Sequence, residues 1–137
     1  MPRRLRIIGG LKAVEAIIEE YKRMIYHYNS LIAGTGYYLK PMHIVTRRTE
    51  NGFKRYIYIG RYWWKVSYAG KKGKTSRIRW IYVGRDKPPE LQNYPDPPRH
   101  PIEGLRFAAE GEDIILDEKT YQRFSWLFKG YRVEPVD

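Results

Sequence analysis

The sequence predicts an α+β fold, in which a long N-terminal helix accompanies an antiparallel sheet of two hairpins. Three observations lead to this prediction. Apolar residues first recur every three or four positions, as in an amphipathic helix, and from Met42 they recur every second position, as in strands. Asn51-Gly52 and the Gly/Lys-rich segment 70–74 interrupt the alternating region, where tight hairpin turns are expected.

The predicted helix follows a short basic arm, MPRRLRIIGG, and stops before Gly34 and Gly36. Its apolar stripe has alternating spacings of three and four and consists of Leu11, Val14, Ile18, Tyr21, Ile25, Tyr28 and Ile32. Two interpretations of this stripe are open. Either the stripe packs on the protein's own sheet or, because the repeat holds for three heptads, it forms the seam of a homodimer.

Four strands are expected after the helix. MHIVTRR and FKRYIYIG form the first hairpin around Glu50-Asn51-Gly52, and residues 62–69 and 75–83 form the second. β-branched and aromatic residues fill all four segments, which is typical of strands. The sheet is therefore expected to be antiparallel.

The second half of the chain begins with a proline-rich segment. Residues 88–101 contain six prolines, which predicts an extended connector. It separates residues 1–87, with the arm, helix and basic sheet, from residues 102–137, which we expect to form a small acidic β–helix–β unit. All three segments are expected to pack as one domain. In that unit, strands are expected at 105–109, 113–116 and 131–136, with Asp117 as the N-cap of the helix.

Positive charge is concentrated in the middle of the chain. The whole sequence has 26 basic and 15 acidic side chains, for a net charge of +11. Residues 34–87 hold fourteen of the basic groups but only two acids, Glu50 and Asp86, so this segment alone carries +12. Solubility gives no reason for such a concentration, and we interpret the segment as the working surface. A further hypothesis is that the acidic C-terminal segment folds over this surface and weakens its binding.

Alternation divides the second hairpin into two faces. Trp64, Val66, Tyr68, Ile78, Trp80 and Tyr82 form an apolar, aromatic face that is expected to meet the core. The opposite face is expected to bind nucleic acid, and it consists of Trp63, Lys65, Ser67, Arg77 and Arg79, extended by Arg47 and by Lys54 or Arg55, with Lys71, Lys72 and Lys74 at the turn. Cations neutralise phosphates, a hydroxyl donates to phosphate oxygens and an aromatic ring stacks on bases. The competing interpretation is the charge-rich surface of a heat-adapted protein.

No enzyme site is expected. The segment GKKGKTS is close to the phosphate-binding pattern GxxxxGK[ST], but Tyr68 stands where the first glycine is required and a strand follows where a helix is required. The chain has no cysteine, and its three histidines have no metal-ligand spacing. We therefore expect no catalytic residue, no metal and no cofactor.

The stretches VSYAGKKGKTSR (66–77) and RDKPPEL (85–91) resemble the seven-kilodalton archaeal chromatin proteins, over about residues 63–91. The resemblance implies a sheet lying on the minor groove of DNA. It also implies that Trp63 occupies the strand with the apolar wedge, that Ser67 is a contacting hydroxyl and that Arg77 is a contacting arginine. The family keeps small residues beyond this arginine, whereas this chain has Ile78 and Trp80.

These observations together predict a non-enzymatic nucleic-acid-binding protein of a thermophilic archaeon or its virus, with little sequence preference. Duplex DNA is the favoured partner, with single-stranded DNA or RNA as alternatives. The alternative function is a structural or assembly protein, such as a virion component or adaptor, that contacts other proteins. No apolar run reaches the ~18 residues of a membrane span, so no membrane partner is expected and the predicted location is the cytoplasm, at the nucleoid, or the virion.

Overall fold

The structure is a computed structural model that describes residues 3–73 and 75–136, with the backbone alone at 69, 71, 72, 75 and 76. Two α-helices and seven strands follow one another, together with two short 3-10 helices. The order is β1 (Arg4–Ile7), α1 (Gly10–Leu31), β2 (Tyr37–Thr49), β3 (Gly52–Lys72), β4 (Thr75–Gly84), η1 (Pro89–Leu91), β5 (Arg106–Glu110), β6 (Asp113–Asp117), α2 (Glu118–Phe124), η2 (Ser125–Phe128) and β7 (Val133–Val136).

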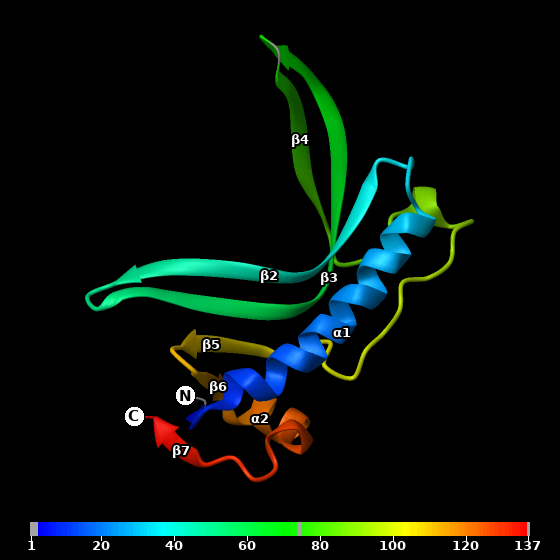
Figure 1. Cartoon of the computed structure of the whole chain (residues 1–137). Coiled ribbons are helices and arrows are strands. Elements are labelled where there is room, and N and C mark those ends of the chain that lie inside the picture. Colours follow the sequence, from blue (N-terminus) through cyan, green and yellow to red (C-terminus); the bar gives the residue numbers. More distant parts are fainter. Residues whose placement is uncertain (1–2, 74, 137) are drawn as a thin grey trace.

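All seven strands belong to one antiparallel sheet, which confirms the α+β class. The strand order is β2-β3-β5-β6-β1-β7, and β4 pairs with the distal part of β3 (Figure 1). Within the described residues, no helix has the length and apolar character needed to cross a membrane.

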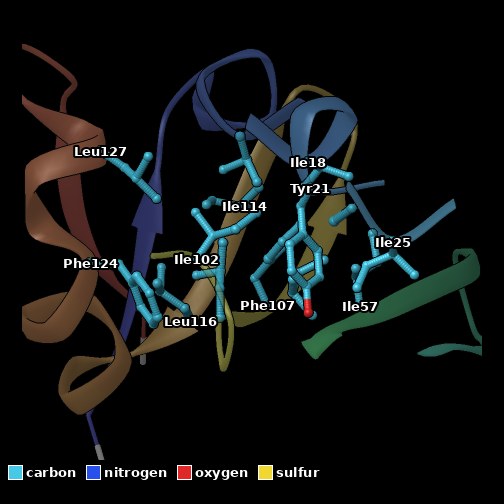
Figure 2. Packing of buried hydrophobic residues seen from close by; sticks show 14 of the residues in the cluster. Ile18, Tyr21, Ile25, Ile57, Ile102, Phe107, Ile114, Leu116, Phe124 and Leu127 are labelled. Atoms are coloured by element: carbon cyan, nitrogen blue, oxygen red, sulfur yellow. The ribbon is translucent and has the colours of Figure 1, made fainter. Parts of the chain in front are cut away.

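The predicted N-terminal helix is confirmed as α1, and its stripe is buried in the chain's own core. Every stripe residue except the partly buried Leu11 is less than 9% exposed. Figure 2 shows Ile18, Tyr21 and Ile25 beside residues of β3, β5 and β6, with the α2 and η2 side chains completing the cluster. The core interpretation therefore accounts for the stripe, since a dimer seam through these side chains would require the core to open.

The two expected hairpins are present, but they share a strand. The turns lie where they were predicted, with Thr49 opposite Gly52 in one hairpin and Lys72 opposite Thr75 in the other. The prediction of separate strands before and after Gly60 is wrong, because β3 continues through 21 residues. A register irregularity in the β2–β3 pairing, between Lys40 and Met42, absorbs the extra residue beside Gly60 without ending the strand.

The N-terminal basic arm is a strand rather than a free segment. β1 lies between β6 and β7, and its partner in β6 is more than 100 residues away along the chain. The C-terminal strands join the same sheet, because β5 pairs with both β6 and β3. Proline-rich residues 88–101 pass alongside α1, where the Tyr28 hydroxyl donates to the Pro95 carbonyl at 2.6 Å.

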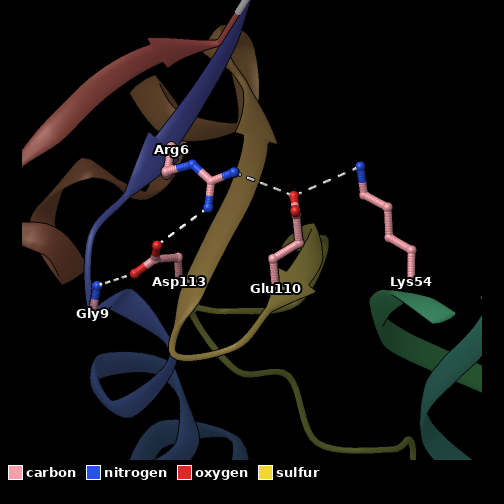
Figure 3. A network of polar contacts seen from close by, with 5 residues as sticks. All are labelled: Arg6, Gly9, Lys54, Glu110 and Asp113. Carbon is pink, nitrogen blue, oxygen red and sulfur yellow. Dashed lines mark hydrogen bonds and ion pairs between the residues drawn. The ribbon is translucent and has the colours of Figure 1, made fainter. Parts of the chain in front are cut away.

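Ion pairs connect these distant segments (Figure 3). Arg6 Nη1 lies 3.2 Å from Asp113 Oδ2, and its Nη2 lies 3.5 Å from Glu110 Oε2. Asp113 Oδ1 also accepts a 2.7 Å hydrogen bond from the Gly9 backbone N–H, at the start of α1. Lys54 on β3 lies 3.8 Å from Glu110. The acidic turn between β5 and β6 therefore joins β1, α1 and β3.

Asp117 caps α2, as the sequence predicts. Its Oδ1 accepts a 2.7 Å hydrogen bond from the Thr120 N–H, and Arg106 Nη2 lies 3.3 Å from its Oδ2. Burial alone would raise the pKa of Asp117. The hydrogen bonds from Thr120 and the charge of Arg106 outweigh this effect, so the pKa lies below its ordinary value of 3.8.

We expect Asp117→Ala to lower the free energy of unfolding by about 1 kcal/mol, because the N-cap acceptor is lost. Since the folded pKa is below the unfolded one, the carboxylate stabilises fully above the unfolded pKa of about 3.8 and less as the pH falls through the folded pKa. Urea denaturation at neutral and acidic pH should show the stability difference shrinking on acidification. Asp117→Asn, which retains a cap oxygen, should lose less stability at neutral pH. A stability deficit of Asp117→Ala that did not change with pH would contradict this assignment.

Candidate nucleic-acid interface

Two ribbons of two strands extend away from the helices (Figure 1). The two ribbons are separate because different strands pair with different parts of β3. β5 pairs with one edge of β3 only at residues 55–58, and the pairing of β2 with the other edge ends at Lys65. We call residues 45–56, the tip of the β2–β3 hairpin, the first arm. Residues 64–83, from β3 and β4, form the second arm. Both arms contain parts of β3, so this one strand connects them.

On the first arm, Arg47 lies directly opposite Lys54 in the strand register. The Arg47 guanidinium carbon is 5.3 Å from the centre of the Tyr56 ring, and Lys54 Nζ is 5.6 Å from the same centre. Arg55 pairs with Thr46 and, by alternation, points to the other side. Lys54 is therefore the residue that extends the Arg47 face, although Glu110 partly neutralises it.

On the second arm, four predicted contact residues lie on one side of the ribbon. Ser67 is opposite Arg79, and Lys65 and Arg77 share their side by alternation. Lys65, Arg77 and Arg79 are exposed. In the part of the chain that the structure describes, none of these three cations is within 4.0 Å of a carboxylate. The side chains of Lys71 and Lys72, and all of Lys74, lie outside the described residues.

The prediction that Trp63 faces nucleic acid is wrong. Its side chain is 1% exposed and packs edge-on against Tyr28 of α1, with ring centres 6.0 Å apart. The reason lies in β2. Leu39, the partner of Trp63, exchanges two 2.8 Å hydrogen bonds with the Asn29 side chain, and these hold this part of the sheet against the helix. Trp63 is thus a core residue, and the second arm begins at the next residue.

The prediction that the aromatic face of the second hairpin meets the core is also wrong. Ile78 is 59% exposed and Trp80 is 43% exposed, because beyond Trp63 the hairpin leaves the body and both of its faces meet solvent. Alternation correctly assigns Trp80 to the side opposite Arg77 and Arg79. It cannot show whether another layer covers that side.

Aromatic side chains that are half-buried or exposed form two groups, which meet around a hollow lined by His43, Tyr62, Trp64 and Tyr82. We call the two groups together the aromatic ridge. Its members are Tyr38, His43, Tyr58, Tyr62, Trp64, Trp80 and Tyr82. Neighbouring ring centres along it are 5.3 to 6.4 Å apart. Lys40 Nζ lies 4.8 Å from the Trp64 ring centre and 4.6 Å from that of Trp80. The ridge therefore combines edge-to-face and tilted aromatic contacts with a cation.

Tyr38 and Tyr62 on the ridge are neutral hydrogen-bond donors at neutral pH. Burial raises the pKa of both phenols above their ordinary value. Near Tyr62, the positive charge of Arg85 opposes this increase without cancelling it. The sequence places Trp64, Trp80 and Tyr82 of this ridge on the face expected to meet the core, because an alternating aromatic pattern is also typical of a covered face.

Most described ion pairs lie on the body, whereas Lys54 is the one arm cation, among those whose side chains are described, with a carboxylate within 4.0 Å. Arg6, Arg61, Lys87 and Arg106 each have a carboxylate within 4.0 Å. On the arms, the one described ion pair is that of Lys54. The acidic C-terminal segment thus reaches the first arm at Glu110. It has no described ion pair with the second arm.

No family model, curated protein or solved structure matches the chain. The resemblance to the seven-kilodalton chromatin proteins therefore stays a prediction. Of its three transferred positions, Ser67 and Arg77 lie on the unpaired basic side of the second arm and Trp63 lies in the core. Residues 3–73 and 75–136 contain no group of three or more His, Asp or Glu side chains arranged to hold a metal ion.

Proposed function

We propose that the protein binds nucleic acid through its two arms, with little sequence preference and without catalysing a reaction. The observation that carries this proposal is the row of exposed cations on the second arm, Lys65, Arg77 and Arg79, which have no described carboxylate partner. Unpaired cations on one side of a ribbon form a field that attracts a polyanion, and counterion release makes phosphate binding favourable.

The shape of the arms fits this partner. The major groove of B-DNA is about 12 Å wide and admits a two-stranded ribbon. The second arm is such a ribbon, and its ten-residue strand β4 is roughly 33 Å long at ~3.3 Å per residue. Arg47 on the first arm supplies a further cation with no described carboxylate partner, so contacts with phosphates along a duplex are available on both arms.

The aromatic ridge supports a second mode of contact. Bases of any sequence stack on aromatic side chains, and each stacked base contributes about 1–3 kcal/mol. Trp64, Trp80 and Tyr82 are exposed enough to meet an unpaired base, and Lys40 lies among them. Duplex DNA remains the leading partner for the arms, and single-stranded DNA or RNA is the partner that the ridge favours.

The test is the salt dependence of binding. Each neutralised phosphate contributes about 0.9 to the slope of log affinity against log salt, so four contacts give a slope of about −3.6 for a duplex. Fluorescence anisotropy should show this slope with duplex DNA and a shallower slope of about −2.8 with single strands of matched length, where each phosphate contributes about 0.7. Competition among duplex DNA, single-stranded DNA and RNA identifies the preferred partner. An affinity that did not change between roughly 50 and 200 mM salt would exclude the backbone mechanism.

A second candidate function is assembly with other proteins, and exposed apolar residues on the second arm favour it. Ile78, Ile81 and Val83 are each more than 45% exposed on β4, a strand that pairs with β3 and with neither β2 nor β5. Two-stranded ribbons are marginally stable alone, so a covering partner would stabilise this one. Light scattering at low and high salt separates the candidates, because hydrophobic association persists in salt and assembly on nucleic acid dissolves.

A further inference from the structure

A hollow of about 510 Å³ lies where the base of the second arm, β5 and α2 meet. Four basic side chains line it, and they come from three separate parts of the chain. Arg85 follows β4, Arg106 begins β5, and Lys119 and Arg123 belong to α2. No carboxylate lines this hollow among the described residues. Sequence analysis did not select any of these four residues, because they are scattered over the chain.

The charges of the hollow are only partly neutralised. Arg106 is paired with Asp117 at 3.3 Å. Arg85, Lys119 and Arg123 have no ion pair within the described part of the chain. Two acids, Asp86 and Glu103, line an adjoining hollow of about 320 Å³, and Glu103 is engaged there by Arg61 at 2.9 Å. The four cations and Asp117 together leave an excess of three positive charges.

Arg123 is held in position without a carboxylate. Its Nη2 donates to the Glu103 backbone carbonyl at 3.2 Å, and its guanidinium lies 5.0 Å from the centre of the Phe124 ring. Gly104 makes this placement feasible, since a Cβ there would lie 2.6 Å from Arg123 Nη1. A guanidinium fixed by neutral groups keeps its charge and its remaining N–H donors for a ligand, and planar arginine donors match phosphate oxygens.

The hollow also has an aromatic wall that belongs to the ridge. Tyr58 and Tyr62 line it, and His43 lies against both rings, at 6.3 and 5.8 Å between centres. A group bound at the cations is therefore close to rings on which a base can stack. Phosphate and base together are the chemistry of a nucleotide.

We propose that this hollow is a phosphate pocket that binds a nucleotide, with the phosphate at Arg85, Lys119 and Arg123 and the base at Tyr58 and Tyr62. The same chemistry has two sources, a free nucleoside monophosphate and the 5′-phosphorylated end of a nucleic-acid strand. Binding of a free nucleotide stands independently of the function proposed for the arms. Binding of a strand end rests on that function.

The first test is calorimetric titration with AMP and with adenosine. The pocket variant is Arg85→Gln/Lys119→Gln, and the control is Lys12→Gln/Lys129→Gln, which removes the same charge from exposed sites away from the hollow. All four positions are exposed, so both variants should fold, and circular dichroism checks this. AMP should bind the wild type at least about tenfold more tightly than adenosine, and the pocket variant should lose this preference. Equal binding of AMP and adenosine, or the same loss in the control, would overturn the free-nucleotide proposal.

The second test compares oligonucleotides with a 5′-phosphate and a 5′-hydroxyl. If the pocket takes a strand end, the wild type should prefer the phosphorylated strand and the pocket variant should bind both equally. Arg77→Ala/Arg79→Ala should weaken both strands and keep the preference. If AMP binds but oligonucleotides do not, the pocket stands and the function proposed for the arms fails. If oligonucleotides bind but neither AMP nor the 5′-phosphate is preferred, the pocket fails and the function of the arms stands.

Discussion

Replacing Trp63 with alanine is expected to lower the free energy of unfolding by about 3–5 kcal/mol, the usual cost of removing a large aromatic side chain from a core. Trp63 is 1% exposed and packs against Tyr28, opposite the buried Leu39. The deletion leaves a cavity at the place where β2, β3 and α1 meet. Guanidinium denaturation, followed by circular dichroism, measures the loss.

Trp80→Ala is the matched control, because it removes the same side chain from the exposed ridge. Trp80 contacts Tyr38, Trp64 and Lys40 there, so we expect a loss of about 1 kcal/mol or less. For nucleic-acid binding the expected order reverses. Trp80→Ala should weaken binding to single strands, whereas the conservative Trp63→Phe should leave affinity unchanged. A folded Trp63→Phe protein with strongly reduced affinity would restore the contact role that the resemblance implies.

Arg77→Ala/Arg79→Ala should weaken binding to every nucleic-acid sequence to a similar extent. Both side chains lie on the unpaired side of the second arm, Arg79 opposite Ser67, and their removal leaves no buried group unsatisfied. If each contacts one phosphate, the slope of log affinity against log salt should become shallower by about 1.8. Affinities measured by anisotropy for several unrelated duplexes over a salt series test both statements.

The control for this variant is Lys12→Ala/Lys129→Ala, which lowers the net charge by the same two units away from the arms. It should change the salt slope little. If the control and the arm variant weaken binding equally, total charge and not the second arm governs affinity. A loss confined to one duplex sequence would indicate that the arginines read base edges.

Local patterns predicted the elements whose interactions are short in range. The α1 stripe follows helical periodicity, and Glu50 and Asn51 form the first hairpin turn between the paired Thr49 and Gly52. Asp117 caps α2 through a residue three positions away. Each of these depends on neighbours along the chain, which a sequence shows directly. The basic side of the second arm was predicted for the same reason, because alternation in a strand is a local property.

Pairing between strands that are distant along the chain could not be predicted from the sequence. Arg4–Ile7 becomes a strand only because β6 and β7 lie on either side of it. The short β5 pairs with β3 only at residues 55–58, so the rest of that edge of β3 is left to other partners. The proposed phosphate pocket likewise depends on Arg85 meeting Lys119 and Arg123 of α2, which lie far from it along the chain. Their positions along the chain contain no signal of this meeting.

The sequence by itself determined the fold class, the long helix, the two turns and which side chains of the second hairpin share a side. Only the tertiary structure decided that Trp63 is buried while Trp80 meets solvent. The physical reason is that strand alternation divides side chains between two faces, whereas burial depends on whether another layer covers a face. That layer ends at Trp63, where α1 and β2 hold β3 against the core, and beyond it the second arm has solvent on both sides.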